Sequence, residues 1–220
     1  MLSHLVPYLL FVLPHSVGEM LPLHWVSPPV RAWLDPLSVL LSGGALVWFA
    51  RRGAYPELRR SPAPRGSVLL ALGAGLAVAL LWMPLSLIVP SGVGERAGFN
   101  PYLAGEASVP WLWAARILGA VVVVPFAEEL MVRSLIPRWL DAMDAWRARP
   151  IGAFTAMSAG GSIAFFTLSH PEWLAALVTA ALWTGLVAKT RRLGDAVLAH
   201  AVANGLLAAA WIASGDTTWW

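Results

Sequence analysis

One run of residues limits what this chain can fold into more than any other feature. Between Gly66 and Gly94 there is no Asp, Glu, Lys or Arg. The run is longer than the roughly 20 apolar residues that cross a bilayer as a helix. Across the 220 residues, 58% are hydrophobic and 12% charged, and a soluble domain of this size needs more charge to cover its surface. We therefore expect an all-α, polytopic transmembrane helix bundle that forms a single membrane domain over residues 1–220.

Proline, glycine and charged residues divide the chain into about seven apolar segments, within a range of six to eight. We expect the first to be a retained helix, because it lacks the basic start and the cleavage site of a signal peptide. Residues 91–110 are expected to form a loop, and residues 141–149 a short helix in the membrane interface. The predicted membrane helices are 2–18, 33–51, 67–90, 110–138, 152–169, 172–189 and 195–213.

The positions of the basic residues predict an orientation in the membrane. A net charge of +3 resembles that of a nucleic-acid-binding protein, but eleven of the fifteen Lys and Arg residues fall in every second loop. Such loops are cytoplasmic by the positive-inside rule. This places the N-terminus inside and the C-terminus outside, with the lipid bilayer and not nucleic acid as partner. The preference for Arg over Lys favours a bacterial plasma (inner) membrane.

Two adjacent glutamates lie inside the fourth segment, after a strongly apolar run. An ionisable side chain in a membrane helix costs about 2.5–3.5 kcal/mol on insertion scales, so such residues usually serve a function. Glu129 and Arg133 are four residues apart and share a helix face, which allows an ion pair. Glu128 points about 100° away from Glu129 and has no local partner. An unpaired buried carboxylate suits a general base that works near neutral pH.

Two histidines lie in comparable settings on other segments. His170 ends the fifth segment, four residues after Phe166, and His200 lies early in the seventh, four residues before Asn204. Both pairs therefore share a helix face. We predict that Glu128, His170, His200 and Asn204 line one water-accessible cavity. A straight fifth helix would, however, carry His170 to the outer face of the membrane, at a different depth from His200.

We expect the other histidines and the glycines to have structural roles. His4, His15 and His24 have Pro-rich surroundings and are expected in loops or at the interface. Cysteine is absent, which excludes disulfides and thiolate catalysis. The glycines within the apolar segments are expected to allow close helix packing. These are Gly73, Gly75, Gly160, Gly161 and Gly185.

Three motifs occur in order on separate apolar segments, and together they resemble those of the CPBP family. That family contains the CAAX prenyl proteases and the bacteriocin-processing (ABI) proteins, which are intramembrane glutamic endopeptidases. The resemblance covers about residues 110–213, which we take as the catalytic core beside N-terminal helices and a loop over 1–109. The sequence at 98–101, Gly-Phe-Asn-Pro, is similar to the branch found beside bacterial exosortase systems. The motifs are Glu128-Glu129-x-x-x-Arg133, Phe166-x-x-x-His170 and His200-x-x-x-Asn204.

The resemblance implies a mechanism and a site. Glu128 and His170 would polarise the attacking water, and His200 and Asn204 would hold the oxygen of the tetrahedral intermediate. The implied enzyme is a membrane-embedded protease that needs no cofactor and hydrolyses a peptide bond of a membrane-associated protein or peptide. The supporting residues of the motifs are Glu129, which Arg133 would brace, Arg133 itself and Phe166.

Other functions remain open at this point. Two histidines and a carboxylate are an acceptable zinc ligand set, which would make the enzyme a metal-dependent membrane protease. Some relatives are non-catalytic and act in bacteriocin immunity or as scaffolds. A transporter is expected to show inverted repeats, and none is evident. The sequence defines neither the substrate nor the oligomeric state.

Overall fold

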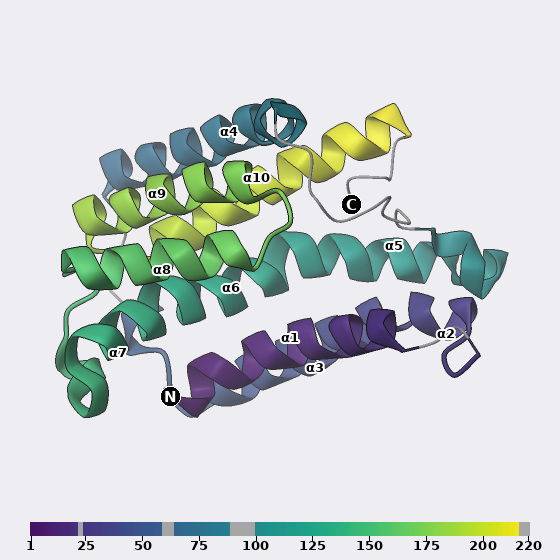
Figure 1. Cartoon of the computed structure of the whole chain (residues 1–220), viewed down its shortest axis with the longest axis horizontal. Coiled ribbons are helices and arrows are strands. Elements are labelled where there is room, and N and C mark those ends of the chain that lie inside the picture. The colour runs from purple at the N-terminus through teal and green to yellow at the C-terminus, as the bar shows by residue number, and fades with distance from the viewer. Residues whose placement is uncertain (22–23, 59–63, 89–99, 216–220) are drawn as a thin grey trace.

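The structure is a computed structural model that describes residues 1–21, 24–58, 64–88 and 100–215. Within these ranges the chain forms helices and turns and no strand, so the all-α fold class is confirmed. Figure 1 shows the long helices lying side by side along one direction, with a continuous helical rod from α5 to α7 running between the α1–α3 pair and the other helices. The predicted positions of the His15 side chain and of residues 91–99 lie outside the described part.

The elements follow the predicted segments closely. The N-terminal half contains α1 (Leu2–Met20), α2 (Pro28–Ala32), α3 (Leu34–Arg51), the 3-10 turn η1 (Pro56–Leu58) and α4 (Arg65–Ile88). After the 3-10 turns η2 (Pro101–Ala104) and η3 (Glu106–Ser108), the rod consists of α5 (Val109–Leu118), η4 (Gly119–Val123), α6 (Val124–Glu129), η5 (Leu130–Leu135) and α7 (Ile136–Ala142). The last elements are η6 (Met143–Ala148), α8 (Ala156–Leu168), α9 (Trp173–Thr190) and α10 (Leu193–Ser214).

In the part of the chain that the structure describes, five helical stretches are long and apolar enough to cross a membrane, so the chain is a multi-pass membrane protein. The stretches that correspond to the first and fifth predicted segments, Leu2–Gly18 and Ala156–Leu168, are shorter. The second of them, α8, has 13 residues and extends about 20 Å, less than the roughly 30 Å of a hydrocarbon core. Figure 1 shows that α8 ends beside the middle of the α5–α7 rod.

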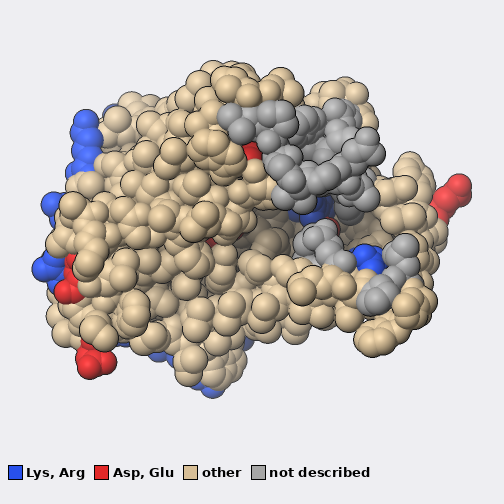
Figure 2. Space-filling view, in the orientation of Figure 1, with Lys and Arg blue, Asp and Glu red and all other residues tan. Residues whose placement is uncertain are grey.

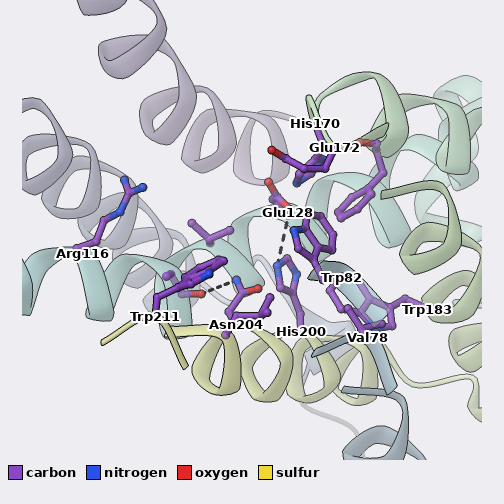
Figure 3. Close-up of a pocket in the computed structure, with 14 residues that line it drawn as sticks. Val78, Trp82, Arg116, Glu128, His170, Glu172, Trp183, His200, Asn204 and Trp211 are labelled. Atoms are coloured by element: carbon purple, nitrogen blue, oxygen red, sulfur yellow. Dashed lines mark hydrogen bonds and ion pairs between the residues drawn. The ribbon is translucent and has the colours of Figure 1, made fainter. Parts of the chain in front are cut away.

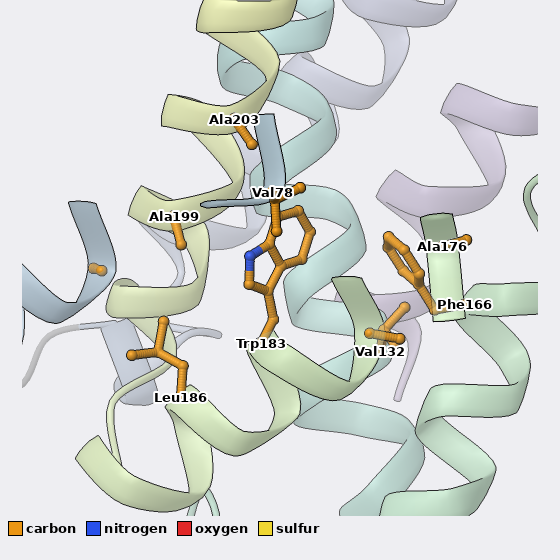
Figure 4. Packing of buried hydrophobic residues seen from close by; sticks show 10 residues of the cluster. Val78, Val132, Phe166, Ala176, Trp183, Leu186, Ala199 and Ala203 are labelled. Carbon is orange, nitrogen blue, oxygen red and sulfur yellow. The ribbon is translucent and has the colours of Figure 1, made fainter. Parts of the chain in front are cut away.

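The main hydrophobic core brings five elements together. Trp183 of α9 and Phe166 of α8 are both almost fully buried and lie beside Val132 of η5 and Val78 of α4. The facing positions on α9 and α10 are small, which leaves room for the two large rings (Figure 4). These small residues are Ala176, Ala180, Ala199 and Ala203.

A buried polar cluster links the start of α1 to the end of the rod. His4 is fully buried, and its Nε2 lies 2.7 Å from Glu57 Oε1 in η1. Ser134 Oγ donates to the same carboxylate oxygen at 2.7 Å, and Arg138 donates at 2.8 Å. Burial alone would raise the pKa of Glu57, but the hydrogen bonds with His4 and Ser134 outweigh it and lower the pKa to about 2. The predicted loop position of His4 is wrong, because the residue lies in α1 and contacts a carboxylate 53 residues away.

Helix α4 packs closely on α10 at one glycine. A Cβ added to Gly75 would lie 2.5 Å from the backbone oxygen of Ala199 and 2.9 Å from Val202 Cβ. Gly73, Gly160 and Gly185 have open space at that position, and Gly161 faces the end of one leucine side chain. The predicted role in close helix–helix packing is therefore confirmed for Gly75 and wrong for the three that face open space.

This contrast predicts different effects of the same substitution two residues apart on α4. Gly75→Ala should lower the free energy of unfolding by about 1–3 kcal/mol, because the added methyl group would clash with the backbone of α10, which cannot move away as a side chain can. Gly73→Ala should be neutral or stabilising by up to about 1 kcal/mol, since Ala favours the helix and meets nothing. Thermal unfolding in detergent measures both, and equal effects would contradict the close approach of α4 and α10.

Candidate active site

The two glutamates lie on a short α-helical segment between two π-helical segments of the rod. α6 ends at Glu129, with η4 before it and η5 after it. A side chain from another helix bonds a backbone oxygen of each π-helical segment: Asn204 Nδ2 donates to Ala120 O at 2.8 Å, and Ser162 Oγ donates to Val132 O at 2.5 Å. Such π-helical turns change the register of side chains and are frequent at functional sites. Helices α8 and α10 thus help to set how the glutamates are presented.

Glu129 is the centre of a buried network. Its Oε1 accepts from Arg133 NH1 at 3.2 Å, which confirms the ion pair that the four-residue spacing predicts. The same oxygen lies 3.0 Å from Nδ1 of His200. The Arg133 guanidinium also lies over the ring of Phe166, 4.5 Å from its centroid. The sequence does not reveal the contact between Glu129 and His200, because the two are 71 residues apart.

This contact orients His200 toward Glu128. An ionised carboxylate only accepts hydrogen bonds, so the Glu129 contact assigns a proton to Nδ1 of the histidine. The other nitrogen, Nε2, lies 4.0 Å from Glu128 Oε2, beyond direct hydrogen-bond length (Figure 3). Glu128 is 8% exposed, and Oε2 has no hydrogen-bond partner among the described residues. Two polar atoms therefore face the same small space from α6 and α10.

His170 lies in the turn between α8 and α9. Its Nδ1 is 2.8 Å from the backbone oxygen of Phe166, so this nitrogen is the donor, and in the neutral imidazole Nε2 is the acceptor. The imidazole stacks on the Phe166 ring, with centroids 4.3 Å apart and planes 30° from parallel. The motif spacing of four residues therefore produces both a stacked ring and a fixed tautomer.

One cavity of about 260 Å³ joins these groups. Glu128, His170, His200 and Asn204 all line it, together with Phe166. The depth conflict disappears because α8 is short and brings His170 to the level of the other three. Figure 2 shows this face of the molecule hollowed near its middle, and Figure 3 shows the side chains that converge on the cavity. The catalytic roles of these residues remain predictions.

The cavity also contains residues that the sequence motifs did not reveal. Glu172 is 8% exposed and lies just before α9, and its only sequence signal is its place directly after the His170-Pro171 pair. Arg116 of α5 lies on the opposite part of the wall (Figure 3). Across the described residues, no group of three His, Asp or Glu side chains could hold a metal ion. The aromatic residues of the wall are Trp82, Trp183 and Trp211.

Comparison with protein families agrees with this site. Residues 110–206 match the family model described as "Type II CAAX prenyl endopeptidase Rce1-like". This segment is Rce1-like. The matched region begins in α5 and ends in α10, so it contains the three motifs and the predicted resemblance to the CAAX protease family is confirmed. Searches of curated proteins and of solved structures found no match to the chain.

The Glu129–Arg133 pair predicts strongly coupled substitutions. Glu129→Gln and Arg133→Met should each destabilise the protein by about 3–5 kcal/mol, because each leaves a charge buried without its partner. The double variant should lose less than the sum, since no uncompensated charge remains. Unfolding free energies from denaturant titration in mixed micelles, followed by tryptophan fluorescence, complete the cycle. Additive losses would show that the pair makes no energetic contact.

Proposed function

We propose that this chain is an intramembrane endopeptidase of the glutamic type that cleaves a membrane-associated protein or peptide. The observation that carries the proposal is the single cavity in which Glu128 lies with two histidines and a carboxamide, inside an Rce1-like membrane protein. The chemistry needs a base near water, a positioned proton carrier and a donor for the developing oxyanion. The cavity wall contains all three kinds of group.

In the proposed first step, Glu128 takes a proton from a water molecule that His170 Nε2 also holds as acceptor. The water oxygen attacks the carbonyl carbon of the scissile bond, and the carbonyl oxygen becomes an oxyanion. The oxyanion then re-forms the carbonyl as the C–N bond breaks, and protonated Glu128 gives its proton to the nitrogen of the leaving amine, so the products are a carboxylic acid and an amine. One water is consumed, and the proton transfers use only groups of this chain. His170 can accept a hydrogen bond from the water at Nε2 because its proton lies on Nδ1, which donates to the Phe166 carbonyl.

The oxyanion would be stabilised from α10. Asn204 has two N–H donors and uses one on the Ala120 carbonyl, so the other is available to the intermediate. The Glu129 carboxylate holds Nδ1 of His200, which turns Nε2 toward the intermediate, and Nε2 is a donor in the doubly protonated ring. Each such donor is worth about 10²–10³-fold in rate in other enzymes. Arg133 keeps Glu129 in place through its own ion pair.

The decisive experiment compares two glutamate substitutions. Glu128→Gln should lower cleavage by about 10²–10⁴-fold, because an amide cannot take the proton. Glu106→Gln, which makes the same change at an exposed turn outside the cavity, should leave the rate unchanged. The full chain in vesicles is incubated with membrane-anchored peptides, including one with a prenylated CAAX-type tail, and the products are identified by mass spectrometry.

The same assay separates the alternatives. Full activity of Glu128→Gln would reject the glutamate mechanism. Loss of activity of the unmodified chain with a chelator, and recovery with added zinc, would favour the metal-dependent reaction. If the unmodified chain captures membrane partners but cuts none of the peptides, the immunity or scaffold function is favoured instead.

We also propose that the basic end of the bundle faces the cytoplasm. Figure 2 shows blue side chains along the left edge of the visible face, the end at which α8 begins in Figure 1. The chain has no native cysteine, so single cysteines report the side of the membrane directly. Ala107→Cys and Ala148→Cys change two exposed alanines at opposite ends of the α5–α7 rod.

An impermeant maleimide on intact bacterial spheroplasts should label Ala107→Cys and leave Ala148→Cys unmodified. Both should react after permeabilisation, which controls for exposure. The reverse pattern would invert the orientation, and labelling of both in intact spheroplasts would place the two ends on the same side.

A further inference from the structure

Arg116 lies on the cavity wall away from the groups that the proposed mechanism uses. It belongs to the same rod as Glu128, and the residues between them at four-residue intervals, Ala120 and Val124, also line the cavity. Residues four apart share a helix face, so the four positions form one stripe along the wall. In Figure 3, Arg116 is well separated from the two histidines, and Asn204 and Trp211 lie between them.

The charges of the cavity wall are separated along this stripe. Among the described residues that line the cavity, Arg116 is the cation, and Glu128 and Glu172 are the acidic residues, which lie near the proposed reaction centre. The Arg116 side chain is 24% exposed, and its NH1 donates to Asp35 of α3 at 2.8 Å. Asp35 lies in the first turn of α3.

A guanidinium can bind a second anion while it keeps the first. It offers five N–H donors in a planar fork and remains charged at any working pH. Arginine is the residue best suited to bind carboxylates in a partly buried place, where it forms short charge-assisted hydrogen bonds. The Asp35 pair holds the side chain in position and offsets the cost of a charge in a membrane span. The cavity therefore has a positioned cation some distance from the reaction centre.

We propose that Arg116 is the binding subsite for an anionic group of the substrate, either a terminal carboxylate or an Asp or Glu side chain. This inference rests on the proposed function of the same cavity. Glu128 is twelve positions after Arg116 along the helical rod, which is about 18 Å. An extended peptide covers that distance with about five residues. The subsite therefore acts as a ruler that sets the scissile bond about five residues from the anionic group.

The cavity wall between Arg116 and Glu128 predicts which side chains the substrate has between its anionic group and the scissile bond. Ala120 and Val124 face that stretch from the rod, and Leu207 and Trp211 line it from α10. Such a lining binds apolar side chains and offers little to charged ones. The expected substrate segment is thus an acidic group, about four apolar residues and then the bond that is cut.

The test uses peptides of one apolar sequence that differ only at the position of the charge. One ends in a free carboxylate, one in an amide, and two amide-terminated versions carry Glu or Lys about five residues from the scissile bond. The unmodified chain in vesicles should cleave the carboxylate or Glu peptide with a kcat/KM about 10- to 100-fold above that of the plain amide, mainly through KM. The Lys peptide should be the poorest substrate. The carboxylate and Glu arms distinguish the two sources of the anion.

Three variants assign this preference to Arg116. In Arg116→Gln, the ratio between the anionic peptide and the amide should fall to about 1. In the charge swap Asp35→Arg/Arg116→Asp, which keeps an ion pair between α3 and α5, the Lys peptide should become better than the Glu peptide. Arg51→Gln removes the same charge from the exposed end of α3 and should keep the full ratio.

Several results would overturn the subsite. They are equal cleavage of all four peptides by the unmodified chain, an equal loss on all peptides in Arg116→Gln, or an unchanged preference in the swap. Either of the last two results would mean that the Arg116–Asp35 ion pair only holds α3 to α5. If no peptide is cleaved, fluorescence anisotropy of labelled peptides bound to Glu128→Gln gives the same comparison. Equal binding there rejects the subsite, whereas cleavage that survives Glu128→Gln rejects the proposed function instead.

Discussion

The carboxylate of Glu129 is the group on which the rest of the candidate site depends. It lies fully buried in a membrane span and accepts from Arg133 and from the ring of His200. A guanidinium there without a counter-charge would cost far more than the net gain of a surface ion pair. The pair therefore makes it possible for Arg133 to lie over Phe166, whose ring in turn stacks on His170. A single carboxylate thus connects the rod to both histidines, on α10 and at the end of α8.

The backbone of the rod is held by the same neighbours that complete the site. Asn204 donates to a carbonyl of η4, and Ser162 donates to a carbonyl of η5. Because Asn204 is also the proposed oxyanion donor, removal of its amide would alter both the stabilisation of charge and the presentation of Glu128. Residues that act as a unit give losses that are not additive. The effect of an Asn204 substitution alone is therefore no measure of its contribution to the oxyanion.

Local patterns predicted the features that depend on local physics. The helices and the Glu129–Arg133 pair follow from hydropathy and from a four-residue spacing, which adjacent turns of one helix satisfy on their own. The contacts between His4 and Glu57 and between His200 and Glu129 join residues 53 and 71 apart, and no periodicity encodes them. The glycines show the same limit. Nothing in the sequence distinguishes Gly73 from Gly75. Only the position of α10 makes Gly75, and not Gly73, necessary for close packing.

The length of α8 explains how a histidine can reach the middle of a membrane protein. A helix of about 20 Å ends before the hydrocarbon core does, so its last carbonyls need hydrogen-bond donors inside the protein. Ser169 Oγ and His170 Nδ1 both lie 2.8 Å from the Phe166 carbonyl, and Thr167 Oγ1 donates to Ile163 O at 2.8 Å. The helix end is thus closed by polar side chains, one of which is the proposed catalytic histidine. Extension of α8 by another turn and a half would remove the need for these donors and carry His170 out of the cavity. The fixed tautomer of His170 and the position of the reaction centre therefore both follow from where helix α8 ends.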